Sequence, residues 1–255
     1  MRTVMVGANP RGKAIAAVLG ASESGLQQAD LVVLCVEDYA QIPELPPGPD
    51  VVNLTSGTSE QAVEAGIRFG ARYLDGALMA HPEHVGRPET VLVYSGSREV
   101  FDRHSELLAR LGRTTYLGPD PGTASLYDAA MLNFAWATLI GYLQTATLLG
   151  TASVRAETFT PLLTDWLKST VVDVISDYAG QIDAGRYPGD EEWLELDAPL
   201  MRHLITATEQ RGLDSALPRL IESLTARGIA AGRGAESFAS LVEVIRGGGP
   251  RPATT

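Results

Sequence analysis

One stretch, residues 121–150, constrains the fold of this chain more than any other. It begins with Pro121 and Gly122, and Gly141 is the only helix breaker inside it. A single helix over this range would be roughly 40 Å long at about 1.5 Å per residue. Its apolar side chains fall on every face of such a helix, so all faces have to be buried. The stretch therefore predicts a spine between two domains or between two subunits.

A membrane span is the alternative for this stretch, since about twenty apolar residues are enough to cross a bilayer. Asp128, Asn133, Gln144 and several threonines interrupt the apolar run. No basic cluster flanks it, and charged residues inside spans are rare. The sequence therefore favours a buried helix, and we expect no membrane partner.

The charge and the cysteine count narrow the class of protein further. The net charge is −11, which argues against nucleic acid, because binding to phosphate backbones needs a basic surface. Cys35 is the only cysteine, so no disulfide can form within the chain. The first residues follow a strand pattern and show no signal peptide. We therefore expect a cytoplasmic protein.

Before residue 121, short apolar strands alternate with helical patterns, which is typical of a parallel α/β sheet. Strands are predicted at residues 3–6, 31–36, 51–54, 73–75, 91–94 and 114–117. After residue 150 only helical patterns follow, at about 157–184, 197–211, 216–227 and 235–246. The predicted domains are therefore 1–120, the spine helix 121–150 and a helical domain 151–246, with a disordered tail at 247–255.

A glycine turn after the first strand is the clearest candidate for a cofactor site. A strand followed by G-x-G-x-x-G and a helix binds the pyrophosphate of a dinucleotide. The pattern here is Gly7, Asn9 and Gly12, with Arg11 between the last two. Asn9 places a side chain where the backbone of the second glycine would approach phosphate. A dinucleotide site and a structural corner without a ligand both stay open.

Asp128 is the candidate catalytic residue, because it stands among apolar side chains of the spine helix. Burial raises the pKa of an unpaired carboxyl group, as a general acid near neutral pH requires. A structural carboxylate, paired with an arginine or with capping backbone, is the alternative. His81 and His84 have a metal-like spacing but stand in a predicted turn, so no metal site is expected.

The order of motifs resembles the imine reductases and reductive aminases, NADPH-dependent enzymes of the β-hydroxyacid dehydrogenase type. The matching segments are 6–12 (VGANPRG), 31–39 (LVVLCVEDY), 52–58 (VNLTSGT), 73–79 (YLDGALM), 93–96 (VYSG) and 120–128 (DPGTASLYD). The resemblance implies an α/β fold with a Rossmann-like N-terminal domain, a long interdomain helix and an all-helical dimerisation domain. It also implies a homodimer with intertwined helical domains, whose active site lies between the domains of two subunits.

The resemblance also implies roles for single residues. Asp128 matches the family's proton-donor position on the spine helix. Trp136 falls where an aromatic residue lines the substrate pocket, and Asn53 falls in the segment beside substrate and nicotinamide. Met79 and Trp166 are the remaining candidate residues for binding a small-molecule substrate.

The N-terminal domain departs from the family pattern in one respect. In the family, a second strand ends in a turn that grips the adenosine ribose and its 2′-phosphate. Only eleven residues separate Leu19 from Leu31 here, whereas a strand–helix unit takes about thirty. We therefore expect a truncated Rossmann-like domain in which Gly7, Asn9, Arg11 and Gly12 are a degenerate site. The expectation is that no cofactor is bound, with NADPH as the alternative.

Three hypotheses about function follow from these observations. The favoured one is an enzyme of imine reductase type that performs non-redox acid/base chemistry on a natural-product intermediate, with Asp128 as acid or base. The second is a working NADPH-dependent imine reductase that acts on a cyclic imine. The third is a binding dimer without catalytic activity.

Overall fold

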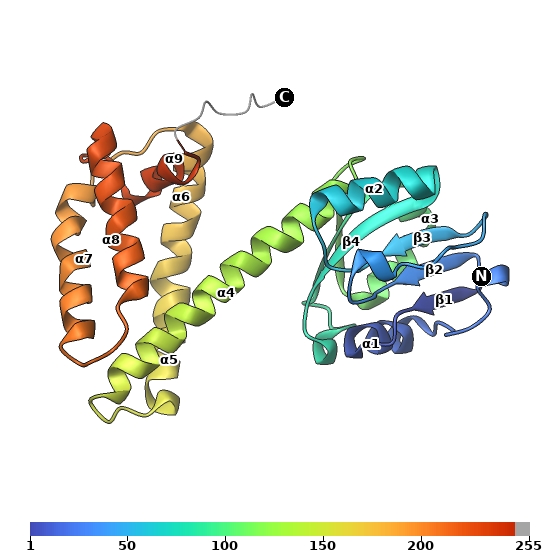
Figure 1. Ribbon diagram of the computed structural model, residues 1–255, viewed down its shortest axis with the longest axis horizontal. Coiled ribbons are helices and arrows are strands. Elements are labelled where there is room, and N and C mark those ends of the chain that lie inside the picture. Colours follow the sequence, from blue (N-terminus) through green and yellow to red (C-terminus); the bar gives the residue numbers. More distant parts are fainter. Residues whose placement is uncertain (248–255) are drawn as a thin grey trace. The chain divides into compact units, whose positions relative to one another are not determined.

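The computed structural model describes residues 1–247 and divides into two compact units, Met1–Ala137 and a second one that begins at Thr138. The division falls inside the long helix α4 (Gly122–Gly150), which is continuous, as the sequence predicts (Figure 1). Of the predicted tail at 247–255, residues 248–255 lie outside the described residues.

The first unit is built on a six-stranded sheet whose strands lie side by side in chain order. The strands are β1 (Thr3–Val6), β2 (Leu31–Leu34), β3 (Asp50–Asn53), β4 (Tyr73–Met79), β5 (Val91–Gly96) and β6 (Arg113–Tyr116). The helices beside them are α1 (Pro10–Leu19), α2 (Ser59–Phe69) and α3 (Arg98–Leu108). All strands predicted from the sequence are present, and β4 is longer than expected.

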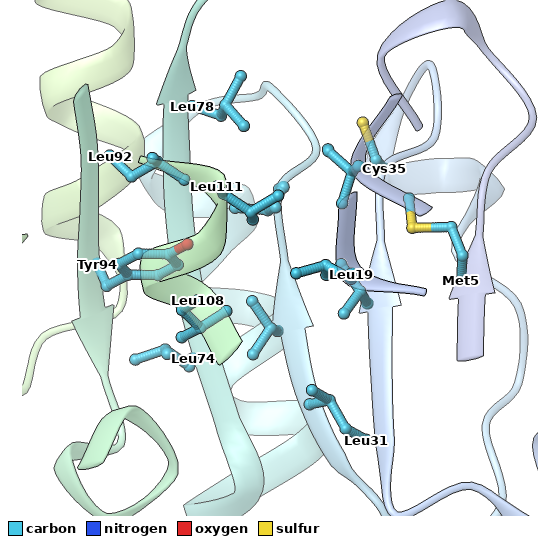
Figure 2. Close-up of a cluster of buried hydrophobic side chains, with 14 of the residues drawn as sticks. Met5, Leu19, Leu31, Cys35, Leu74, Leu78, Leu92, Tyr94, Leu108 and Leu111 are labelled. Carbon is cyan, nitrogen blue, oxygen red and sulfur yellow. The ribbon is translucent and has the colours of Figure 1, made fainter. Parts of the chain in front are cut away.

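Alternate residues of the strands point to opposite faces of the sheet, and each face has its own core. Leu31 and Val33 belong to a cluster that α1 and α3 cover with Ile15 and Leu108. Figure 2 shows this cluster, with side chains from α1, the strands and the segment around Leu111 filling one side of the sheet. Val32 and Leu34 point the other way, into a cluster covered by α2. The unit therefore has three layers, helix, sheet and helix.

The sheet is mixed rather than parallel, which corrects the expectation from the strand–helix alternation. β4 and β5 pair antiparallel, from Leu74 opposite Gly96 to Met79 opposite Val91. The connection between them holds only a single 3₁₀ turn, Pro82–His84. A parallel pair needs a crossover of a dozen or more residues, usually a helix, so this short connection reverses the chain.

Strand β1 lies at the edge of the sheet, and the crossover that follows it is unusual. The connections through α1 and through α2 both advance in the same direction across the sheet, yet the two helices cover opposite faces (Figure 1). The two crossovers therefore have opposite hands, although right-handed ones are the strong rule. On the outer edge of β1 there is one bridge, between Val4 and Ser22. Both observations are consistent with the predicted lack of a strand–helix unit beyond β1, which stays a prediction.

The long helix α4 is buried only in its first turns. Gly122, Ala124, Ser125 and Asp128 are buried there. Leu126 in these turns is exposed, and farther along large apolar side chains are about half exposed in the single chain: Met131, Phe134, Trp136, Leu139, Ile140 and Leu143. In the part of the chain that the structure describes, α4 included, no helix has the length and apolar character to cross a membrane.

The second unit is helical throughout its described residues. Its main helices are α5 (Ala156–Trp166), α6 (Val172–Ala184), α7 (Leu194–Glu209), α8 (Ala216–Gly228) and the short α9 (Leu241–Ile245). A π-helical segment, Leu167–Val171, joins α5 to α6, so the predicted helix at 157–184 is one continuous element with a local change of winding. Leu194, Leu241 and Val244 form its buried cluster.

We expect Leu74→Ala to destabilise the first unit strongly. Leu74 on β4 is 0% exposed, and removing its side chain leaves a cavity in the core beneath α3. Such truncations cost about 2–5 kcal/mol, measurable by urea unfolding. Ile67→Ala is the matched control, because Ile67 is 80% exposed and its loss should change the unfolding free energy by about 0.5 kcal/mol or less. Equal effects of the two substitutions would contradict this packing.

Candidate functional site

A row of three buried polar side chains crosses the centre of the sheet. Asn53, Asp75 and Ser95 come from β3, β4 and β5, and the strand register places each opposite the next. All three are 0% exposed. They point to the face of the sheet that α2 covers, since Tyr73 and Ala77 on the same strand face pack on that side. Buried polar groups of this kind have to be hydrogen-bonded.

The first turn of α4 lies on this row and supplies the missing partners. The Ser95 hydroxyl donates to the carbonyl of Pro121 at 2.9 Å and accepts from the backbone N–H of Ala124 at 2.8 Å. The Ser125 hydroxyl donates to Asp75 Oδ2 at 2.7 Å. These bonds fix the position at which α4 begins above the sheet.

Asp75 has donors on both of its carboxylate oxygens. Oδ1 accepts from the hydroxyls of Tyr73 at 2.9 Å and Tyr39 at 3.0 Å, and the Asn53 amide lies 3.5 Å away. Burial raises the pKa of Asp75 to about 7, although the bonds from Ser125, Tyr73 and Tyr39 favour the ionised form. Burial and the Asp75 charge raise the pKa of both tyrosines, which therefore stay protonated donors.

Asp128 lies one helical turn after Ser125 and is 6% exposed. Within residues 1–247, no hydrogen bond or ion pair reaches its carboxylate. The structural alternative for Asp128, a carboxylate paired with an arginine, therefore has no partner in the described chain. A nearly buried carboxylate without a partner is a candidate for a functional site.

The other residues predicted to bind substrate differ in burial and in hydrogen bonding. Asn53 is fully buried, and its amide is committed: Nδ2 donates to the Tyr73 hydroxyl at 3.0 Å, and Oδ1 accepts from the N–H of Thr55 at 3.1 Å. Met79 ends β4 and packs partly buried against the cluster that contains Ala124. Trp136 on α4 is 65% exposed and belongs to the first unit. Trp166, 54% exposed, ends α5 in the second unit.

The glycine turn between β1 and α1 has the backbone that a pyrophosphate needs. Gly7 has a φ of +134°, and a side chain there would meet the carbonyl oxygen of Cys35 at 2.0 Å. A side chain at Gly12 would meet the carbonyl oxygen of Gly7 at 2.7 Å. Both positions therefore require glycine, as the close approach of strand and helix in a dinucleotide turn does.

Asn9 does not obstruct this turn. Its φ is −68°, and its Oδ1 accepts from the N–H of Gly12 at 2.7 Å as the N-cap of α1. Its Nδ2 donates to the carbonyl of Cys35 at 3.0 Å. The side chain is thus folded into the turn and bonded at both ends, instead of projecting to where phosphate would lie.

Arg11 is the basic side chain of this turn. It is partly buried and donates to the Ser56 hydroxyl at 3.2 Å, in the loop between β3 and α2. Burial raises the pKa of the neighbouring Cys35 thiol in spite of the Arg11 charge, so Cys35 stays neutral. The turn, the start of α1 and the Arg11 charge fit a pyrophosphate group.

The adenosine end of such a site is reduced. Glu37 and Asp38 follow β2, where an acid for the ribose could stand. Asp38 instead caps the short 3₁₀ turn Tyr39–Gln41, its Oδ1 accepting from the N–H of Ala40 at 2.8 Å. Among the described residues, the outer edge of β1 pairs only at the single bridge between Val4 and Ser22. Just after Ser22, the carbonyl of Ser24 accepts a hydrogen bond from the Arg2 side chain. The structure thus offers a complete pyrophosphate turn beside a shortened ribose side.

Residues 1–247 contain no group of three or more histidine, cysteine or acidic side chains placed to hold a metal ion.

Comparison with known proteins shows to which family this chain belongs. The C-terminal domain of NADPH-dependent reductive aminase-like proteins matches residues 120–247. An NADPH-dependent reductive aminase of Aspergillus oryzae is 34% identical over 238 residues, which cover 88% of this chain and 80% of that protein. The chain belongs to the imine reductase and reductive aminase family. The resemblance inferred from the motifs is confirmed.

Solved structures of the family share the fold across 96% of this chain. A Streptomyces aurantiacus imine reductase matches with a TM-score of 0.89 and 27% identity, covering 96% of this chain and 99% of that one. A reductive aminase of Aspergillus terreus in complex with NADPH and ethyl levulinate matches with a TM-score of 0.88, 27% identity and the same coverage. These matches confirm the predicted fold class, a Rossmann-like domain, a long helix and a helical region.

The expectation that the protein binds no cofactor is wrong. The curated relative is an NADPH-dependent enzyme, and structures of family members hold NADPH or NADP⁺. The expectation gave too much weight to Asn9, whose side chain leaves the phosphate side of the turn open. The comparisons likewise give no support to non-redox chemistry, whereas they support the assignment of the chain to a family of enzymes.

Sequence reasoning missed Asp75 and the groups that bind it. The available signal was a lone acidic residue at the third position of the apolar strand Tyr73–Met79. Its partners Tyr39 and Ser125 lie 36 and 50 residues away in the chain. Only the fold brings them together.

We expect Asp75 to make the stability of the fold depend on pH in a defined direction. Its pKa is raised from 3.8 to about 7, so between these values the folded state holds a proton that the unfolded state has lost. The stabilisation is therefore complete below pH 3.8 and is lost as the pH rises through 7. The melting temperature of the wild type, relative to Asp75→Asn, should fall across this window.

Glu64→Gln is the control for this measurement, because Glu64 is an exposed carboxylate of α2. Its difference from the wild type should stay nearly constant over the same pH range. A constant difference for Asp75→Asn as well would mean that Asp75 ionises normally in the folded protein.

Proposed function

We propose that this protein is an NADPH-dependent imine reductase or reductive aminase. The observation that carries the proposal is its 34% identity with an NADPH-dependent reductive aminase over most of both chains. The geometry supports it at two points, a glycine turn that fits a pyrophosphate and a nearly buried, unpaired Asp128. The activity assay is NADPH oxidation with cyclohexanone and allylamine, which occupy a structure of a relative.

The residues that would hold the cofactor belong to the first unit. Gly7 and Gly12 let its pyrophosphate approach the backbone, and the first turn of α1 and Arg11 supply positive charge. When bound, NADPH supplies a hydride to the carbon of a C=N bond. The protein has to place that carbon against the nicotinamide and control the proton that the nitrogen takes up.

Asp128 is the residue that we assign to this proton. Reduction of an imine to an amine adds one hydride to carbon and one proton to nitrogen. In its acid form Asp128 donates the proton, and the carboxylate left behind recovers one from water. Its low exposure and the lack of a partner in residues 1–247 leave it available to a substrate nitrogen.

Met79, Trp136 and Trp166 are proposed to bind the apolar part of the substrate. All three are apolar, and the two tryptophans expose about half or more of their surface in the single chain. Large exposed aromatic rings are typical of binding surfaces. Asn53 is proposed to lie beside the nicotinamide of the cofactor. The hydrogen bonds of its amide to Tyr73 and Thr55 hold the side chain in one orientation.

A homodimer is part of the proposal. The apolar side chains of α4 beyond its first turns are about half exposed in the single chain. Extended apolar faces of this kind mark interfaces that resemble a core divided between two chains. A second copy of the chain is the partner that we assign to this face.

We expect Asp128→Asn to lower kcat about 10²-fold or more, the usual effect of removing a general acid. The amide is nearly isosteric, so the fold and NADPH binding should persist. Glu64→Gln is the matched control, an exposed carboxylate changed to an amide on α2, and it should retain wild-type kcat. Unchanged kcat in Asp128→Asn would remove Asp128 from the reaction.

We expect Ile140→Glu to convert the dimer to monomers, measured by light scattering at micromolar concentration. Ile140 is 52% exposed on α4, and a charge there would be buried without a partner in a dimer. Ile67→Glu places the same charge on α2, at a residue 80% exposed, and should leave the dimer intact. A wild-type protein that is monomeric under these conditions would contradict the homodimer.

A further inference from the structure

We propose that Asp75 is a positioning residue: its carboxylate fixes the first turn of α4 and thereby sets the place of the Asp128 carboxylate. The inference rests on the proposed role of Asp128 as proton donor. It assigns Asp75 no contact with the substrate, because the side chain is 0% exposed and its oxygens are already occupied.

The Asp75 carboxylate joins four separate segments of the first unit. Oδ2 accepts from the hydroxyl of Ser125 on α4. Oδ1 accepts from Tyr39 in the turn after β2 and from Tyr73 on β4, and the Asn53 amide on β3 lies beside it. An ionised carboxylate can accept about four hydrogen bonds at once, which no neutral side chain of this size can do. The bonding pattern therefore favours the carboxylate at this position, whereas burial favours its acid form.

The link from Asp75 to Asp128 runs through a single turn of helix. Ser125 and Asp128 are three residues apart on α4, so they share a face of the helix. The backbone N–H of Ala124 donates to the buried Ser95 hydroxyl at 2.8 Å, which adds a second bond to the same turn. A turn held by two bonds to buried groups transmits little movement, and a displacement of about 1 Å at a reacting group can cost 10²-fold in rate.

Within residues 1–247, the side chains that hydrogen-bond to Asp75 carry no charge. The titratable groups that face it are Tyr39, from the turn after β2, and Tyr73, from β4. β3 and α4 contribute the neutral groups of Asn53 and Ser125. Tyr39 is only partly buried, and its ring packs against Gly57, where an added side chain would meet it at 2.4 Å. The hydroxyl network therefore runs from the protein surface to the buried carboxylate.

The test compares Asp75→Asn with Asp50→Asn. Asp50 is also a buried carboxylate, 8% exposed, but it begins β3 and bonds Arg103 at 2.6 Å and His104 at 2.8 Å, away from α4. We expect Asp75→Asn to lower kcat about tenfold while the KM for NADPH stays within about twofold, because the cofactor turn is untouched. Asp50→Asn should lower the melting temperature and leave kcat unchanged.

A double-mutant cycle that combines Asp75→Asn with Asp128→Asn distinguishes a positioning role from a general loss of structure. If Asp75 acts through Asp128, then Asp75→Asn should lower kcat no further in the Asp128→Asn background. Ser125→Ala, which removes only the hydroxyl link, should lower kcat in the same direction and show the same dependence on Asp128. This second variant also decides the question if Asp75→Asn does not fold.

Three results would overturn the inference: wild-type kcat in both Asp75→Asn and Ser125→Ala, an equal loss of kcat in Asp50→Asn, or additive losses in the cycle. Failure of the proposed function gives a different result. In that case Asp128→Asn itself retains kcat, or the wild type oxidises no NADPH with any imine.

Discussion

The hydrogen bonds of one buried carboxylate hold the long helix of this protein to its sheet. Burying Asp75 disfavours its charge, and hydroxyl donors from three segments recover only part of that cost, so its pKa remains near 7. Ser95 adds bonds to Pro121 and Ala124 at the same turn. Because α4 begins on this polar row, the row determines where Asp128 lies, and the chemistry of the site depends on it.

The region of β1, α1 and the glycine turn between them keeps one part of a Rossmann site and is shortened in another. The α1 crossover has the opposite hand to the α2 crossover, and β1 is an edge strand. Both features are those expected of a sheet that lacks a strand beyond β1. The turn that would contact pyrophosphate is nevertheless intact, since Gly7 and Gly12 are sterically required and Asn9 caps the helix. We therefore propose that recognition of the cofactor is concentrated at its pyrophosphate and nicotinamide half.

The sequence predicted the features that depend on local pattern, and it missed those that depend on distant contacts. Helix α4, the strands, the glycine turn and the isolated position of Asp128 follow from periodicity and spacing. The antiparallel pairing of β5 was missed because a connection without a helix resembles any other loop. The role of Asp75 was missed because its donors, such as Tyr39 and Ser125, are far apart in the chain. The error about the cofactor came from two sources. The short segment between Leu19 and Leu31 was taken to abolish binding, and the rotamer of Asn9 is not contained in a pattern of residue types.

Calorimetric titration of the purified protein with NADPH tests whether a shortened Rossmann domain still binds this cofactor. We expect saturable binding with a Kd in the micromolar range, which corresponds to about 8 kcal/mol. Arg11→Ala should weaken binding, whereas substitution of the exposed Lys13 by alanine should not. No measurable binding of NADPH at millimolar concentration would show that the domain has lost its cofactor.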